Sequence, residues 1–262
     1  MKNVMQYMKQ SKVWLQRIII GLLVFSVALC VYDVCKSSVV HAKEKELPIY
    51  SVEREDPVIS ITFDAAWGDE DLEDILQILE AHNCKATFFV TGDWATRYPD
   101  AITKICVAGH ELGSHGANHK HMTQLSESEM KQEITDCHEQ IKQMTGMDMM
   151  LFRAPYGDYN SKVVEVAKTL DYYTIQWDVD SLDWKDYGTD AIVDKVVNHK
   201  DLKNGSIILL HNGSKYTAKA LDTLLTRLEE SGYTFLPVSE LIYKDNYWID
   251  HTGRQRENDV VQ

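Results

Sequence analysis

Short apolar runs alternate with segments of helical periodicity along most of the chain, from about residue 57 to about residue 240. Runs rich in β-branched and aromatic residues predict strands over 58–63, 86–90, 111–114, 151–153, 172–177, 207–210 and 234–237. Apolar residues three and four apart predict helices over 71–81, 98–108, 127–144, 161–170 and 218–230. This alternation predicts an α/β fold, with a mainly parallel sheet inside helices. About seven such units are enough to close an irregular (β/α) barrel.

Unusual polar residues stand where the predicted strands end. Asp64 follows the first strand, His115 the third, and Arg153 ends the fourth; Asp178 to Asp183 follow the fifth and His211 the sixth. The carboxyl ends of parallel strands share one edge of a sheet, where α/β proteins place their chemistry. We therefore expect all of these side chains to face one rim.

The N-terminal segment differs in pattern from the rest. Residues 18–32 carry no charge and follow Lys9, Lys12 and Arg17, so we expect residues 1–42 to be an export signal or a single membrane anchor that sends the body outside the cytoplasm. Val40-His41-Ala42 would suit signal cleavage, and a buried core helix is the alternative reading. We predict a linker over 43–56, the main α/β domain over 57–245 and a C-terminal tail over 246–262.

Charge and cysteine content exclude several functions. The first 42 residues have a net charge of +4 and the remainder −17, so binding to nucleic acid through phosphate contacts is not expected. Five cysteines occur without a CxxC pair, and three of them lie in the body. Neither a disulfide framework nor a thiolate zinc site is indicated, and the three are expected to be small buried apolar residues.

Five local patterns occur in the order known from the polysaccharide deacetylase (NodB-homology) family. They resemble the family's TFDDG, H(S/T)xxH, RxPYG, DxxDW and LxH, and here they read Thr62-Phe-Asp-Ala-Ala-Trp-Gly68, His115-Gly-Ala-Asn-His119, Arg153-Ala-Pro-Tyr-Gly157, Asp180-Ser-Leu-Asp-Trp184 and Leu209-Leu-His211. The resemblance covers nearly the whole body. It implies an irregular barrel of the NodB type and hydrolysis of acetyl groups from a carbohydrate.

The resemblance also implies a role for each matched residue. Asp64 would be the general base, held and kept ionised by Arg153, although a purely structural Asp–Arg pair is the alternative. His211 would be the general acid, with Asp183 orienting it and raising its pKa. The backbone N–H of Tyr156 would help to hold the oxyanion. Trp184 and Leu209 would line a pocket for the acetyl methyl group, or would be core residues.

The two histidines of the second motif suggest a metal site. His115 and His119 are four residues apart, and one helical turn would place both imidazoles on one side, able to grip a divalent metal such as zinc. The family's carboxylate ligand, the second Asp of TFDDG, is Ala65 here, which cannot bind a metal. We expect a weakened site in which Asp64, Asp69 or a water fills the gap, or a site that has lost its chemistry.

Several stretches are similar to the sporulation group of this family, the PdaB-like deacetylases. They are residues 63–68, 89–94, 174–185 and 247–255. This similarity implies a spore-forming bacterium, a place at the forespore envelope, and peptidoglycan as the glycan partner. The sugar attacked, N-acetylglucosamine or N-acetylmuramic acid, stays open.

Three functions are compatible with the sequence. The first is an enzyme that releases acetate from N-acetyl groups of cell-wall glycan by metal-assisted attack of water. The second is a catalytically weak or inactive glycan-binding envelope protein, which Ala65 favours and the retained acid–base set disfavours. The third is an esterase that removes O-acetyl groups with the same site.

Overall fold

The computed structural model describes residues 8, 14, 20, 22–27 and 46–258, and the chain divides into two compact units, 1–45 and 46–262. In the first unit, residues 22–27 are helical. Within the described part of the chain, none of the helices combines the length and apolar character that crossing a bilayer requires. Most of the predicted signal or anchor, residues 1–42, lies outside the described residues.

A curled sheet of seven parallel strands forms the centre of the second unit, as predicted. Its order is β6-β5-β4-β3-β2-β8-β7, and the short strand β9 (Thr234–Phe235) pairs with the start of β2. The seven strands are β2 (Val58–Ala65), β3 (Thr87–Val90), β4 (Glu111–Ser114), β5 (Leu151–Phe152), β6 (Tyr173–Thr174), β7 (Val179–Asp180) and β8 (Ile207–His211). The α/β barrel-type fold class is thereby confirmed.

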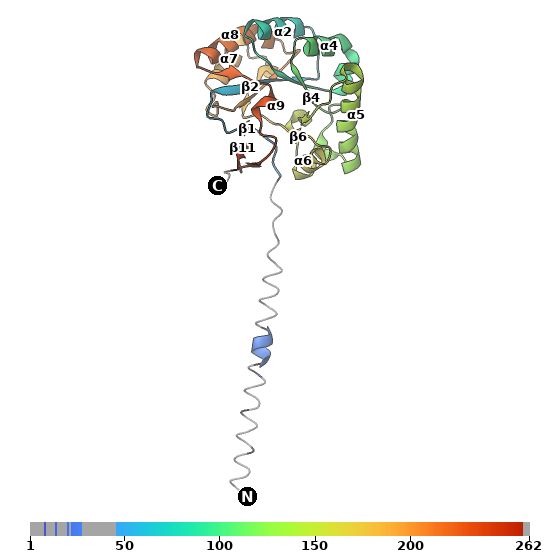
Figure 1. The fold of residues 1–262 in the computed structure, drawn as a ribbon, viewed down its shortest axis with the longest axis vertical. Helices are drawn as coiled ribbons and strands as arrows, with labels where there is room; N and C mark the ends of the chain where they lie inside the picture. Colours follow the sequence, from blue (N-terminus) through green and yellow to red (C-terminus); the bar gives the residue numbers. More distant parts are fainter. Residues whose placement is uncertain (1–7, 9–13, 15–19, 21, 28–45, 259–262) are drawn as a thin grey trace. The chain divides into compact units, whose positions relative to one another are not determined.

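Helices surround this sheet (Figure 1) and pack their apolar sides on it. They are α2 (Leu72–Ala81), α3 (Gly92–Arg97), α4 (Pro99–Val107), α5 (Glu127–Thr145), α6 (Ser161–Lys168), α7 (Thr189–Val197), α8 (Thr217–Glu230) and α9 (Val238–Leu241). The longest, α5, begins at a capping box in which Ser126 and Glu129 bond each other's backbone N–H. It ends at Gly146, whose φ of 73° is a left-handed conformation that glycine adopts without strain.

The two segments predicted to be linker and tail meet in a small second sheet. Its strands β1 (Ser51–Val52), β11 (Arg254–Glu257) and β10 (Tyr247–Ile249) lie in that order, with β1 parallel to β11. Ile49 and Val52 are buried in an apolar cluster together with Leu241 of α9. The predicted linker, 43–56, contributes β1 and the predicted tail, 246–262, contributes β10 and β11, so each segment supplies a pairing partner for the other.

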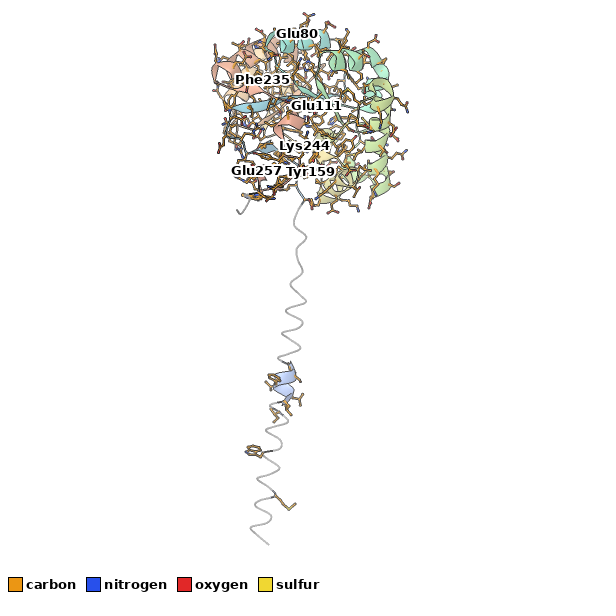
Figure 2. The ribbon with its side chains drawn as sticks, viewed as in Figure 1. Glu80, Glu111, Tyr159, Phe235, Lys244 and Glu257 are labelled. Atoms are coloured by element: carbon orange, nitrogen blue, oxygen red, sulfur yellow. The ribbon has the colours of Figure 1, made fainter. Side chains whose placement is uncertain are left out.

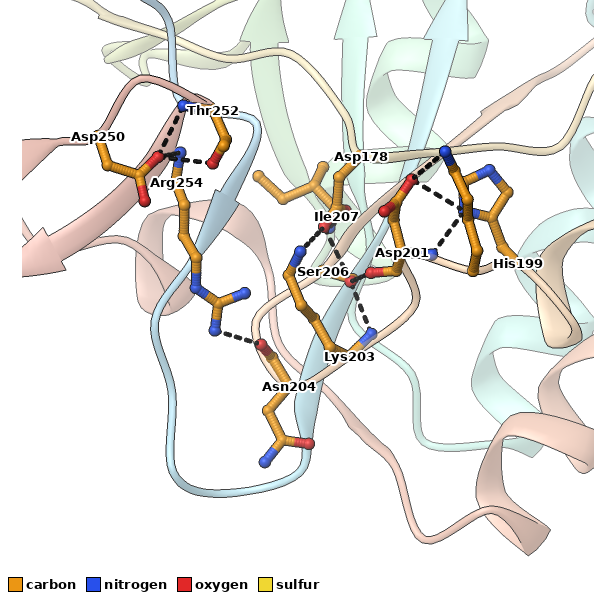
Figure 3. A network of polar contacts seen from close by, with 11 residues as sticks. Asp178, His199, Asp201, Lys203, Asn204, Ser206, Ile207, Asp250, Thr252 and Arg254 are labelled. Atoms are coloured by element: carbon orange, nitrogen blue, oxygen red, sulfur yellow. Dashed lines mark hydrogen bonds and ion pairs between the residues drawn. The ribbon is translucent and has the colours of Figure 1, made fainter.

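Polar contacts attach this small sheet to the large one. Arg254 donates from Nη2 to the carbonyl of Asn204 (3.3 Å), and Ser206 Oγ donates to Asp178 Oδ2 (3.1 Å), as Figure 3 shows. Tyr50 Oη bonds Tyr159 Oη (2.9 Å) on the loop between β5 and α6; Figure 2 labels Tyr159 at the opposite end of the unit from Glu80 of α2. The small sheet thus contacts the turn that precedes β8 and the loop that follows β5.

Candidate active site

Asp64 and His211 are neighbours at the carboxyl ends of the two central strands. The parallel pairing of β2 with β8 places Asp64 opposite His211. Residues opposite each other on paired strands point to the same face. Every residue of β2 is buried, so Asp64 is held on a strand without freedom to shift, and only 6% of it is exposed.

Arg153, which directly follows β5, holds the Asp64 carboxylate from inside the barrel. Its Nη1 donates to Asp64 Oδ1 (2.7 Å) and to Thr62 Oγ1 (2.9 Å), and its guanidinium lies over the Phe89 ring at 4.0 Å. The arginine is fully buried. Burial alone would raise the pKa of Asp64, but the charge of Arg153, with those of His115 and His211, outweighs it and holds this pKa below its ordinary value.

Asp183 holds His211 in one orientation. It lies on a 3-10 turn (Asp183–Lys185) after β7 and is fully buried. Its Oδ1 accepts from His211 Nδ1 (2.7 Å), and its Oδ2 accepts from the His211 backbone N–H (2.7 Å) and from Thr217 Oγ1 (2.7 Å). Burial would lower the pKa of His211, but the bond to Asp183 and its charge raise it above the ordinary value. His211 Nε2 is the ring nitrogen left for chemistry.

His115 and His119 are brought together by a loop and not by a helical turn. Residues 115–119 contain no helix, and Gly116 (φ 77°) and His119 (φ 53°) are both left-handed. The helical-turn argument for this pair is therefore wrong, although the two rings do meet, with centroids 5.0 Å apart. His115 Nδ1 donates to the Arg153 carbonyl (2.8 Å), which turns Nε2 toward Asp64 Oδ2 at 3.6 Å. Burial lowers the pKa of His115, and it lowers that of His119 to about 4.

The remaining predicted site residues differ in how far they are exposed to solvent. Tyr156 is 60% exposed on the 3-10 turn Pro155–Gly157, and its ring contacts those of His119 and His121. Trp184 is 49% exposed, whereas Leu209 is buried on β8. His121 is half-exposed and pairs with Asp158 at 3.3 Å.

Known proteins resemble this chain in sequence and in fold. The family model described as polysaccharide deacetylase matches residues 51–175. The peptidoglycan-N-acetylglucosamine deacetylase of Bacillus cereus is 33% identical over 74% of this chain and 92% of its own length. The peptidoglycan-N-acetylmuramic acid deacetylase PdaA of Bacillus subtilis is 30% identical over 77% of each chain. The chain belongs to the polysaccharide deacetylase family.

Other members of the polysaccharide deacetylase family differ from these two in length or in activity. The chain spans 66% of the length of one relative from Bacillus subtilis and 38% of one from Listeria monocytogenes. A solved structure with a TM-score of 0.72 and 34% identity covers 75% of this chain and 71% of its own. That protein is a mutant of BA3943, described as a pseudoenzyme of this family with restored enzymatic activity; the wild type comes from Bacillus anthracis.

The residues present do not fit a complete metal centre of the kind that the family resemblance implies. His115 donates from Nδ1 to the Arg153 carbonyl and turns Nε2 into the site, which is the usual arrangement of a metal-binding imidazole. However, Ala65 stands where the carboxylate ligand belongs, and Asp64 Oδ1 is already bonded to Arg153. Among the residues that the structure describes, no group of three or more His, Cys, Asp or Glu side chains could hold a metal ion.

Two features of the site were not foreseen from the sequence. Trp67 stacks on His211, with ring centroids 5.1 Å apart and planes 14° from parallel. Asp178 does not join the rim, because its Oδ1 accepts from the backbone N–H of Ile207 at the amino end of β8. Strand direction could have separated Asp178 from Asp183, since the former precedes β7 and the latter follows it.

Proposed function

We propose that this chain removes N-acetyl groups from cell-wall glycan, with peptidoglycan as its polymer. One observation carries the proposal: two charge pairs, Arg153 with Asp64 and Asp183 with His211, each at 2.7 Å, meet where β2 and β8 place Asp64 opposite His211. A general base and a general acid are thus oriented toward a common space. Relatives named as deacetylases of peptidoglycan support the choice of polymer.

The base role follows from the unequal oxygens of Asp64. Oδ1 is occupied by Arg153, whereas Oδ2 faces the site beside His115. A lowered pKa keeps the carboxylate ionised at neutral pH, so Oδ2 is ready to take the proton of an attacking water. The water oxygen then bonds to the acetyl carbon, and a tetrahedral oxyanion forms.

The acid role falls to His211 Nε2. A raised pKa keeps more of the imidazole protonated near neutral pH, and the proton on Nε2 passes to the leaving amine when the C–N bond breaks. The products are acetate and a free amine. Asp64 protonates at low pH and His211 loses its proton at high pH, so the rate should fall on both sides of a maximum.

A second function, glycan binding without efficient hydrolysis, is favoured by one specific observation. Ala65 removes the third metal ligand, and a relative that resembles this chain in fold is described as a pseudoenzyme. Because Ala65 leaves His115 and His119 without a carboxylate partner, we propose that these two histidines bind a divalent metal such as zinc only weakly. We further propose an extracytoplasmic place at the forespore envelope, from the N-terminal pattern and the similarity to sporulation deacetylases.

The test measures acetate released from peptidoglycan by the purified full-length chain, with and without zinc. We compare the protein with Asp64→Asn, which keeps the shape and removes the base, and expect a loss of about a hundredfold or more. Mass analysis of the digested glycan shows which sugar carries the new amine, and mild alkali beforehand removes O-acetyl esters. Equal acetate release by both proteins would contradict the base role of Asp64.

The matched gain-of-function variant is Ala65→Asp. By the family resemblance, position 65 supplies the carboxylate that binds the metal together with the two imidazoles, so zinc should bind at least about tenfold more tightly by titration calorimetry. Acetate release that appears only in Ala65→Asp would favour the glycan-binding function for the natural chain. Unchanged zinc affinity would contradict the site geometry itself.

A further inference from the structure

Trp67 has a place that none of the five motifs explains. It lies on the loop between β2 and α2, two residues beyond Ala65, and 44% of it is exposed. Half-exposed tryptophans beside a glycan site commonly serve as platforms for sugar rings. Here the indole instead lies nearly parallel to the His211 imidazole. The indole face that lies against the imidazole is therefore already covered by the protein itself.

The backbone on both sides of Trp67 is fixed. The carbonyl of Ala66 accepts from Arg97 Nη2 (3.1 Å). The carbonyl of Gly68 accepts from Trp94 Nε1 (3.0 Å) and from Asn212 Nδ2 (2.7 Å). Trp94 and Asn212 are fully buried, so these donors are held by the core. The stacked position of the indole is thus imposed by its loop.

The same loop is joined to the segment that follows His211. The backbone N–H of Gly213 donates to Asp71 Oδ1 (2.7 Å). Gly213 has a φ of 74°, and a Cβ there would lie 2.9 Å from the backbone nitrogen of Gly68. Only glycine permits so close an approach in this conformation. Trp67 and His211 are therefore carried by two segments that are locked together, and their rings keep one spacing.

We propose that Trp67 is a positioning residue for His211, whose indole holds the face of the imidazole while Asp183 holds its Nδ1 edge. Together the two contacts remove the rotation that would turn Nε2 away from the leaving amine. The indole face also stabilises a cationic ring. This inference rests on the proposed role of His211 as general acid, and it adds Trp67 to the residues that hold that acid in place.

The remaining charged groups around His211 come from other elements and stay unchanged when Trp67 is replaced. They are Asp183, Asp64 and Asp180, with His115 and His119 farther across the site. A change in the behaviour of His211 on substitution of Trp67 is then assigned to the loss of the indole. The acidic partner Asp183 stays in place because its other contacts come from Thr217 and backbone N–H groups.

The first measurement does not require activity. NMR titration of the full-length chain labelled with 15N-histidine follows the His211 imidazole, assigned by its loss in His211→Asn. In Trp67→Leu we expect the pKa of His211 to fall by about half a unit, and in Trp67→Phe to stay near that of the parent protein. Trp67→Gln gives a second test if the leucine variant does not fold. Unaltered His211 signals and pKa in folded Trp67→Leu or Trp67→Gln would overturn the proposal.

The second measurement is kinetic and separates positioning from sugar binding. Trp67→Leu should lower kcat about tenfold with KM within about twofold, and Trp67→Phe should restore most of kcat. A rise in KM alone would overturn the proposal in favour of a sugar platform. Trp248→Leu is the matched control, because Trp248 is 49% exposed on β10 of the small sheet. If the parent protein releases no acetate, the deacetylase function fails while the titration still decides the role of Trp67.

Discussion

Two buried aspartates at opposite ends of the large sheet have pKa values shifted in opposite directions. Asp64 lies at the carboxyl end of β2, and Arg153 holds its pKa below the ordinary value despite complete burial. Asp178 lies at the amino end of β8 (Figure 3), where burial raises its pKa from 3.8 to about 6. Both accept well-formed hydrogen bonds, so hydrogen bonding alone does not explain the difference.

The cation that faces each aspartate explains the difference between their pKa values. Arg153 is buried and donates directly to Asp64 at 2.7 Å, whereas Lys203 reaches Asp178 at 3.5 Å from a side chain that is 44% exposed. A desolvated guanidinium in contact favours an ionised carboxylate far more than a solvated ammonium does. Of these two buried aspartates, the one with a lowered pKa is therefore the one at the end where a base is needed.

The largest expected effect comes from Arg153→Met. It leaves the buried Asp64 carboxylate without its cation, so the free energy of unfolding should fall by about 3–5 kcal/mol in denaturant titrations. The pKa of Asp64 should rise, and acetate release at neutral pH should be lost with the base. The double variant Asp64→Leu/Arg153→Met removes both charges and should recover much of the stability. A double variant as unstable as Arg153→Met would show that packing, and not the charge, is what Arg153 supplies.

An intermediate effect is expected from Asp178→Asn, and it depends on pH. Because the folded protein holds the Asp178 proton up to a pKa of about 6 and the unfolded chain only to about 3.8, stability declines as pH rises between these values. Asparagine cannot ionise, so the variant should gain up to roughly 3 kcal/mol on the parent protein from pH 4 to pH 7. Denaturant titrations at four pH values test this. Parallel stability curves would contradict the raised pKa.

The smallest effect is expected from Lys203→Met, the counterpart of the arginine variant. The lost ion pair is solvated on the lysine side, so stability at pH 7 should fall by less than about 1 kcal/mol. The pKa of Asp178 should rise a little further, as carboxyl-group NMR can measure. A loss of stability as large as that of Arg153→Met would contradict the proposed difference between the two ion pairs.

Local patterns predicted the fold well where elements are long and amphipathic. The helix predicted over 127–144 is Glu127–Thr145, because a capping serine and a terminal glycine mark its ends in the sequence. In contrast, β7 has two residues and β1 pairs with β11, about 200 residues away. Neither β7 nor β1 carries a periodicity of its own, and each is set by its pairing partners, so the sequence pattern did not reveal them.

The candidate site was predictable in its residues and less so in its geometry. Family resemblance pointed to Asp64, Arg153, Asp183 and His211, and the structure brings these four together. The histidine loop was mistaken for a helical turn because a spacing of four does not report the left-handed residues between. The stacking of Trp67 on His211 depends on how two loops are bonded to each other, and no local pattern encodes that contact.

The pairing of β1 with β11 places the first and last strands of the second unit side by side. Ser51 lies opposite Arg254, so the first and last strands of this unit are adjacent, at the spacing of about 4.8 Å between paired strands. Because the two strands run parallel, a peptide that joins the end of β11 to the start of β1 must run back along the pair and be longer than a hairpin turn. With such a crossover the unit is suited to circular permutation, and the new connection would not involve the ends of β2 and β8 that carry Asp64 and His211.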